Sequence, residues 1–358
     1  MNAWIASVGT SVPAHRVTQD DVRDTVRAMF EPRMPQIERL LGVFDNGGIA
    51  SRHFCMPLDW YAGSHPVEEK HRLFVANAVA LAEAAARQCL ERAGASPADV
   101  GHIVLVTTTG TATPSIDAHL CNRLGFPASI KRSPLWGLGC AGGAAGLSRA
   151  CEYVEAFPDE LCLLVAVELC SLTFLRDDAS KSNLVATSLF ADGAAAALVA
   201  GSGRRGLDSG VPRVVATQST IWPDTLDVMG WDVTNDGLKV VFSRDIPTLV
   251  RERMPAAVDA LLAPHGLRAA DLARFALHPG GKKVLQAYEE ALHLPAGRLA
   301  ASERVLRDYG NMSSCTVLFV LEAILRDEEQ SERERGLWGI AGALGPGFSS
   351  ELLLLRWE

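Results

Sequence analysis

Residues 136–147 read Trp-Gly-Leu-Gly-Cys-Ala-Gly-Gly-Ala-Ala-Gly-Leu and set one thiol, that of Cys140, among small residues. The alanine-rich segment that follows has Leu147, Cys151 and Val154 at helical spacing, so a helix is expected to begin close to Cys140. The N–H groups and the positive dipole end of a helix N-terminus favour the thiolate, which is the nucleophilic form of cysteine. The glycines allow a sharp turn and leave room for a substrate. This stretch therefore predicts a reactive cysteine.

Two other interpretations of the same stretch are weaker. A cysteine in an intracellular chain is often a small buried hydrophobe. The spacing Gly137-x-Gly139-x-x-Gly142 also matches the dinucleotide-binding fingerprint, but Pro134 and Trp136 precede it in place of an uninterrupted strand. A cysteine inside that fingerprint would have no role in dinucleotide binding, so we favour the interpretation of Cys140 as a nucleophile.

The composition is that of a globular protein, with 358 residues, 48% apolar and 21% charged residues and a net charge of −8. The negative charge and the lack of a dense basic run argue against a nucleic-acid binder. No secretory signal and no apolar run of membrane-spanning length is apparent, so no integral membrane segment is expected. The eight cysteines follow neither a metal-binding nor a disulfide spacing, which predicts a reduced, cytoplasmic protein.

Two segments far apart in the chain repeat one pattern. Residues 95–105 and 267–277 each follow a long predicted helix, carry Ala-Asp at a turn and end in an apolar strand. The segment 309–325 likewise matches the Cys140 turn and its helix. Strands and helices alternating in two copies predict an α/β architecture with sheets covered by helices on both faces. The joint lies in a glycine cluster, giving a half with the nucleophilic cysteine, residues 1–205, and a half with histidine and asparagine, residues 206–358.

If the halves are related by pseudo-symmetry, the loops after equivalent strands bring Cys140, His278 and Asn311 together. Taken singly, His278 could be structural and Asn311 could be a helix N-cap. Together they suit acyl transfer, in which the thiolate attacks a thioester, histidine favours the thiolate and donates to the oxyanion, and asparagine is a neutral second donor. A cysteine protease would use the same three residue types, but the sequence around Cys140 is not of the papain type.

Four motifs resemble those of the type III polyketide synthases, relatives of chalcone synthase in the thiolase superfamily: residues 137–143, 278–281, 309–314 and 345–348. The resemblance implies a duplicated βαβαβαββ fold in five αβαβα layers and a homodimeric acyltransferase. Such an enzyme loads an acyl group from acyl-CoA onto Cys140 and extends it with malonyl-CoA, with His278 and Asn311 assisting decarboxylation and condensation. CoA thioesters are substrates, and no metal or redox cofactor is expected. The alternative is a ketoacyl-acyl-carrier-protein synthase III, which performs one condensation.

The resemblance also implies roles for residues around the cavity. Phe190 corresponds to one aromatic gatekeeper, and Val240 falls where plant enzymes carry the second, so the entrance is expected to differ from theirs. Cys170 and Thr173 correspond to positions that set starter and chain length, and Trp231 lies near the space for cyclisation. Further substrate-contacting positions are Thr108, Thr109, Thr113, Ser313 and Pro346, of which Thr113 is expected to reach into the neighbouring subunit.

Within the family, residues 57–61, 108–115 and 180–187 look most like bacterial alkylresorcinol and alkylpyrone synthases, which use fatty acyl starters. The resemblance does not decide between pyrone and resorcinol closure. At the CoA end, the candidates for contact with the phosphates or the pantetheine arm are Arg52, Gly280, Gly281, Lys282 and Lys283.

Overall fold

A computed structural model describes residues 1–204, 206, 210–326 and 336–357. Its strands are β1 (Ala3–Ser11), β2 (His15–Thr18), β3 (Ser51–Phe54), β4 (Val100–Thr107), β5 (Lys131–Trp136), β6 (Leu161–Leu169), β7 (Asp192–Gly201), β8 (Pro212–Ile221), β9 (Met229–Thr234), β10 (Gly237–Phe242), β11 (Leu272–Leu277), β12 (Trp338–Gly345) and β13 (Ser349–Trp357). Its α-helices are α1 (Gln19–Phe30), α2 (Ile37–Leu40), α3 (Gly42–Asp45), α4 (Val67–Ala93), α5 (Ile116–Leu124), α6 (Gly142–Ala156), α7 (Lys181–Leu189), α8 (Ile246–Leu262), α9 (Lys282–Ala291), α10 (Ala300–Tyr309) and α11 (Thr316–Leu325). The 3-10 turns are η1 (Trp60–Ala62), η2 (Pro97–Asp99), η3 (Gly139–Ala141), η4 (Cys170–Thr173), η5 (Ala263–His265), η6 (Ala269–Asp271) and η7 (Ser313–Cys315).

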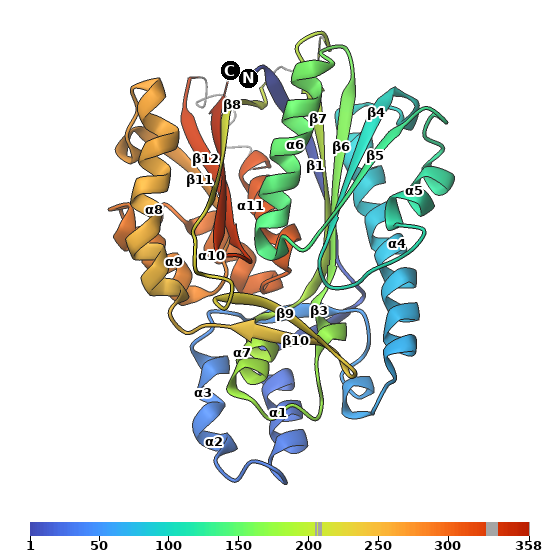
Figure 1. Ribbon diagram of the computed structural model, residues 1–358, viewed down its shortest axis with the longest axis vertical. Coiled ribbons are helices and arrows are strands. Elements are labelled where there is room, and N and C mark those ends of the chain that lie inside the picture. Colours follow the sequence, from blue (N-terminus) through green and yellow to red (C-terminus); the bar gives the residue numbers. More distant parts are fainter. Residues whose placement is uncertain (205, 207–209, 327–335, 358) are drawn as a thin grey trace.

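The described residues form a nine-stranded mixed sheet in the order β11-β12-β13-β8-β1-β7-β6-β4-β5. A short pairing between β1 and β8 joins its two halves. Helices α6 and α11 lie between the halves, while α4 covers one outer face and α8 and α9 cover the other (Figure 1). This is the predicted five-layer arrangement of helices and strands.

The alanine run of β7 explains how helices cover both faces of one half-sheet. Successive strand residues point to opposite faces. Ala194 and Ala196 belong to the apolar cluster under α4. Ala195 and Ala197 belong to the cluster around α6 and α11. Because these side chains are small, both layers of helices approach the strand closely.

The internal repeat expected from the sequence is present in three dimensions. The turns η2 and η6 each place an aspartate, Asp99 and Asp271, in a capping box just before β4 and β11. The η3–α6 and η7–α11 segments are also equivalent, since each is a 3-10 turn that runs into a central helix. Of the predicted joint between the halves, residue 205 lies outside the described residues.

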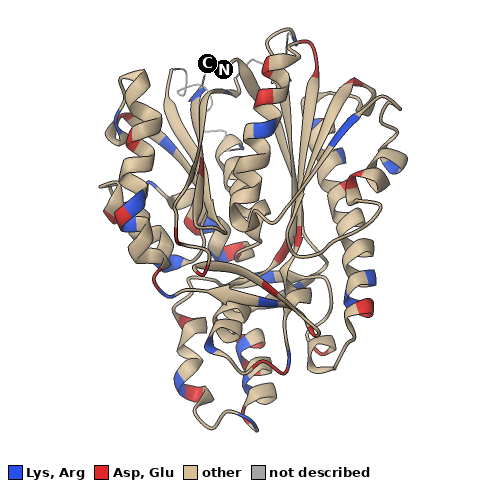
Figure 2. Cartoon of the chain, in the orientation of Figure 1, with Lys and Arg blue, Asp and Glu red and all other residues tan. Residues whose placement is uncertain are grey.

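Helix α4 is long and apolar enough to cross a membrane by composition alone. It packs against β1, β6 and β7, and residues along it such as Phe74, Ala82 and Cys89 are buried in the apolar cluster there. This is the placement of a core helix. Charged residues of both signs are spread over the outer helices (Figure 2).

A smaller subdomain lies at the end of the sheet where the predicted site residues gather. It consists of α1–α3, the β2–β3 pair, α7 and the β9–β10 hairpin (Figure 1). Its own apolar cluster includes Val22, Val26, Phe44 and Leu184. The subdomain supplies most of the side chains that line the cavity described below.

Candidate active site

Cys140 lies in a tight turn between β5 and α6. Gly137 and Gly139 have φ values of +92° and +49°, a conformation that favours glycine. A Cβ on Gly139 would also lie 2.6 Å from Cδ of Pro346. The Gly139 N–H donates to the Thr108 hydroxyl at 3.0 Å. Thr108 and Pro346, both predicted substrate contacts, therefore hold the turn that presents the thiol.

The Cys140 sulfur contacts polar groups of the second half of the chain. Sγ lies 3.6 Å from Oγ of Ser313 and 4.0 Å from Oδ1 of Asn311. Burial raises the pKa of the Cys140 thiol to about 11, although the Ser313 contact opposes the shift. Burial therefore opposes the thiolate that the helix N-terminus is predicted to favour.

His278 and Asn311 reach the site from two other segments. His278 directly follows β11, and its backbone N–H donates to Gly342 O at 2.9 Å. Asn311 Nδ2 donates to Gly280 O at 3.2 Å, two residues beyond His278, while its Oδ1 accepts from Ser313 N at 2.8 Å. Asn311 therefore bonds to the turn before α11 and links the Cys140 turn to the His278 loop. It is not the N-cap residue, which is Met312 for η7 and Cys315 for α11.

The imidazole of His278 is buried, with 3% of the residue exposed. Neither ring nitrogen has a hydrogen-bond partner within the part of the chain that the structure describes. Burial lowers the pKa of His278 to about 3, so the ring is neutral at physiological pH. A neutral ring with both nitrogens available can accept a proton at one nitrogen and donate at the other.

A buried carboxylate that the sequence analysis missed organises the centre. Oε2 of Glu168, at the end of β6, accepts from Thr108 N and Thr109 N at 3.0 Å each and from the Thr109 hydroxyl at 2.7 Å. Its Oε1 accepts from the Ser314 hydroxyl at 2.6 Å. Burial raises the pKa of Glu168, although the hydrogen bonds from Ser314, Thr108 and Thr109 oppose the shift. Glu168 thus joins the two halves of the chain near Cys140. In the sequence, the sign of this role is a charged residue at the end of an otherwise apolar strand.

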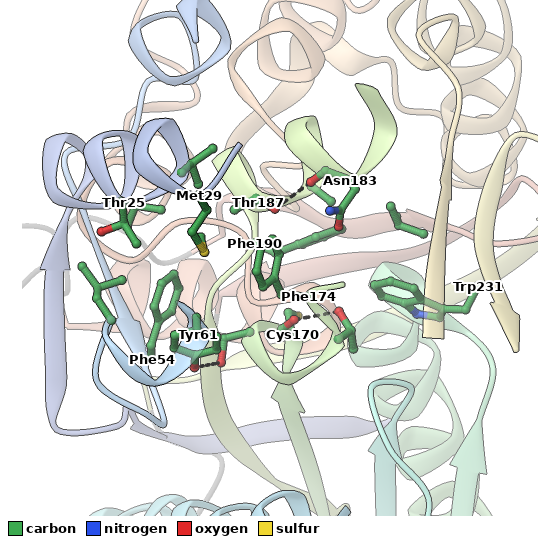
Figure 3. Close-up of a pocket in the computed structure, with 17 residues that line it drawn as sticks. Thr25, Met29, Phe54, Tyr61, Cys170, Phe174, Asn183, Thr187, Phe190 and Trp231 are labelled. Atoms are coloured by element: carbon green, nitrogen blue, oxygen red, sulfur yellow. Dashed lines mark hydrogen bonds between the residues drawn. The ribbon is translucent and has the colours of Figure 1, made fainter. Parts of the chain in front are cut away.

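An apolar cavity of about 550 Å³ extends from this end of the sheet into the small subdomain (Figure 3). Five predicted residues line it, namely Cys170, Thr173, Phe190, Trp231 and Val240. Side chains of α1 and η1 that the sequence analysis did not identify complete the wall, including Val22, Thr25, Val26, Met29 and Tyr61. Cys140, His278 and Asn311 are not among the residues that line it.

Phe190 lies beside aromatic side chains of the β9–β10 hairpin. The ring of Phe190 lies 6.1 Å from that of Trp231 and 6.4 Å from that of Phe242, in the latter case edge-on. Val240 is buried and faces Trp231 across the β9–β10 pair. The aromatic side chain absent at position 240 is therefore replaced by Phe242, on the same face of β10, and by Trp231 on β9.

Comparison with known proteins identifies the family. The family description "Chalcone and stilbene synthases, N-terminal domain" matches residues 1–203, and the corresponding C-terminal domain matches residues 213–357. The chain is a type III polyketide synthase.

Similar proteins cover this polyketide synthase almost completely. A "Putative chalcone synthase" of Bacillus subtilis (strain 168) is 46% identical, covering 99% of both chains. A 1,3,6,8-tetrahydroxynaphthalene synthase of Streptomyces peucetius subsp. caesius is 41% identical, covering 99% of this chain and 93% of the relative. The crystal structure of 1,3,6,8-tetrahydroxynaphthalene synthase from Streptomyces coelicolor A3(2) superposes with a TM-score of 0.91 at 28% identity, covering 100% of this chain and 99% of that one.

The position of Arg52 in this polyketide synthase contradicts its predicted contact with CoA. Arg52 is fully buried, and its guanidinium donates to Thr187 O at 2.6 Å, Phe190 O at 2.7 Å and Gln19 Oε1 at 2.8 Å. The prediction was wrong, because these internal acceptors take the donors that phosphates would need. Arg52 instead braces β3 against the segment that carries Phe190.

The other predicted CoA contacts are placed differently. Gly280 and Gly281 precede α9, and Lys282 and Lys283 are exposed in its first turn. Their ammonium groups and the helix N-terminus can attract an anion at the surface. Thr113, predicted to reach a second subunit, is exposed in the loop before α5.

Proposed function

We propose that this synthase loads a fatty acyl starter from CoA onto Cys140, extends it with malonyl-CoA and closes the product to an alkylpyrone or alkylresorcinol. The observation that carries this proposal is the apolar cavity between α1, η4 and α7, lined by Met29, Val26 and Cys170. Transfer of an alkyl chain from water into such a cavity is favourable by about 0.8 kcal/mol per methylene. Trp231 lies on one side of this space and the α1 residues Thr25 and Met29 lie on the opposite side (Figure 3).

The residues around the thiol suit each chemical step. The Cys140 sulfur attacks the thioester carbonyl, its proton passes to the neutral His278, and CoA leaves as the thiol. Malonyl-CoA then loses carbon dioxide, and the electron pair left behind forms an enolate oxygen. Asn311 Nδ2 donates one hydrogen to Gly280 O, which leaves its second hydrogen for that oxygen. The enolate carbon attacks the acyl group, and the Cys140 sulfur is released. None of these steps requires a metal or redox cofactor.

The test is product analysis with purified enzyme, malonyl-CoA and a series of acyl-CoA starters. We expect triketide or tetraketide products bearing the alkyl chain, an acyl adduct on Cys140 by intact mass, and neither with Cys140→Ser. A product extended only once would support the synthase III alternative. A second candidate function is the one for which the Streptomyces relatives are named, the synthesis of 1,3,6,8-tetrahydroxynaphthalene. Formation of this product from malonyl-CoA alone would show that the starter is a malonyl group.

We also propose that the active form is a homodimer. Strand β5 is the last strand of the sheet, so one of its hydrogen-bonding edges is unpaired within the described chain. Exposed strand edges pair readily with another chain. Trp136, at the end of β5 and four residues before Cys140, is 52% exposed. Light scattering after size-exclusion chromatography tests the assembly, and Thr113→Trp should change starter selection only if Thr113 reaches the partner's cavity.

A further inference from the structure

The apolar cavity and a second hollow share one wall. A polar groove of about 1380 Å³, open to solvent, lies between η1, the start of α4, residues 174–178 and the β9–β10 turn. Tyr61 and Phe174 line both this groove and the apolar cavity. The groove is otherwise rich in charged side chains, including Lys70, Asp177 and Lys239. Two rings therefore lie at the boundary between the apolar cavity and the polar groove.

Tyr61 is the fixed part of this wall. Its hydroxyl donates to Ser171 Oγ at 2.6 Å, since the Ser171 hydroxyl donates to Asp192 Oδ2 at 2.5 Å. Its ring packs edge-on against Trp60 at 5.0 Å and at a steep tilt against Phe54 at 5.6 Å. Asp192 is fully buried and also accepts from two backbone N–H groups. Moving Tyr61 would break a buried hydrogen-bond network, which is costly.

Phe174 is the part that can yield. Its backbone is held, because Phe174 O accepts from Lys70 Nζ at 3.0 Å and its N–H donates to Ser171 O at 3.2 Å. Its ring carries no polar atom and meets the Phe30 ring edge-on at 6.3 Å. The residue is half-buried, with the open groove beside it. A change of side-chain rotamer therefore needs no broken hydrogen bond.

We infer that Phe174, set against the fixed Tyr61, is the end wall that limits the length of the acyl starter, and that its removal lets the chain end pass into the polar groove. This inference rests on the proposed fatty acyl starter. While the wall is closed, a chain longer than the cavity must displace the Phe174 ring or leave methylenes in water. A charged chain end has no place there, because burying an unpaired charge in an apolar space is strongly unfavourable.

The experiment compares the wild-type enzyme, Phe174→Ala and the milder Phe174→Leu. The matched control is Phe157→Ala, which removes an exposed phenylalanine after α6, outside the residues that line the cavity. The probes are saturated acyl-CoA thioesters of increasing length and the mono-CoA thioester of a sixteen-carbon dicarboxylic acid. The readouts are kcat/KM for product formation and the acyl adduct on Cys140.

For the wild type and for Phe157→Ala we expect kcat/KM to fall sharply beyond one chain length and the dicarboxylic thioester to be rejected. Phe174→Ala should raise kcat/KM for the longest chains at least tenfold and accept the dicarboxylic thioester, with Phe174→Leu between them. An unchanged length limit in a folded Phe174→Ala, or in Phe174→Leu if the alanine variant fails to fold, overturns the inference. Failure of the wild type to load any fatty acyl chain instead refutes the proposed function.

Discussion

The resting thiol of Cys140 gives the sharpest test of the site. Its surroundings raise the pKa from 9.0 to about 11 through burial. At pH 8 the thiolate fraction is then about 0.001, roughly a hundredfold below that of a cysteine with pKa 9.0. A more basic thiolate is also a better nucleophile, which recovers roughly tenfold for a shift of this size. The net expectation is alkylation by iodoacetamide about tenfold slower than at an unperturbed cysteine.

The assay is the rate of iodoacetamide modification between pH 6 and pH 10.5, followed by loss of activity and by the mass of the peptide that contains Cys140. We expect the rate to rise throughout this range. Ser313→Ala should displace the profile to higher pH, because the Ser313 contact lowers the thiol pKa. The Cys140→Ala variant gives the background. A rate that is already level below pH 8 would refute this reasoning, since it would show a thiolate stabilised by His278 and the helix N-terminus.

Three further predictions concern stability. Burial lowers the pKa of His278 from 6.5 to about 3, so the unfolded state binds more protons than the folded state between these pH values. The free energy of unfolding should therefore fall as the pH drops from 6.5 toward 3, by about 2 kcal/mol between pH 7.5 and pH 5. Denaturant titrations should show that this loss is absent in His278→Gln. Arg52→Met should lower the free energy of unfolding by about 3 kcal/mol or more because it leaves buried acceptors unpaired, whereas a variant that melts normally and only raises the KM for acyl-CoA would restore the CoA role. Gly139→Ala should lower the free energy of unfolding by about 2 kcal/mol or more and reduce acyl-enzyme formation, because φ is positive there and a Cβ would clash with Pro346. The control is Gly94→Ala, which is also at positive φ but has open space around its Cβ and should cost about 1 kcal/mol. Equal losses of thermal stability in the two variants would contradict the role of Pro346.

The sequence determined the features that depend on local pattern. Glycines and a helical period around Cys140 predicted the turn and α6, and the recurring Ala-Asp turn before an apolar strand predicted the two related halves. Strand ends of the same type meet in such a fold, which is why Cys140, His278 and Asn311 could be expected near one another. Each of these inferences needs only the periodicity of helices and strands.

Tertiary structure alone decided the environment of those side chains. Local sequence suggested a surface cation at Arg52, but packing encloses it with Gln19 and two carbonyl groups. Burial also raises the pKa of the Cys140 thiol, an effect that the sequence around it did not reveal. Phe174 and Tyr61 likewise line the same two hollows although 113 positions separate them in the chain. The hydration of a side chain depends on which distant segments pack around it. The ionisation of Cys140, the hydrogen bonds of Arg52 and the walls of the cavity therefore follow from the tertiary structure, whereas local sequence determines only the helices, strands and turns.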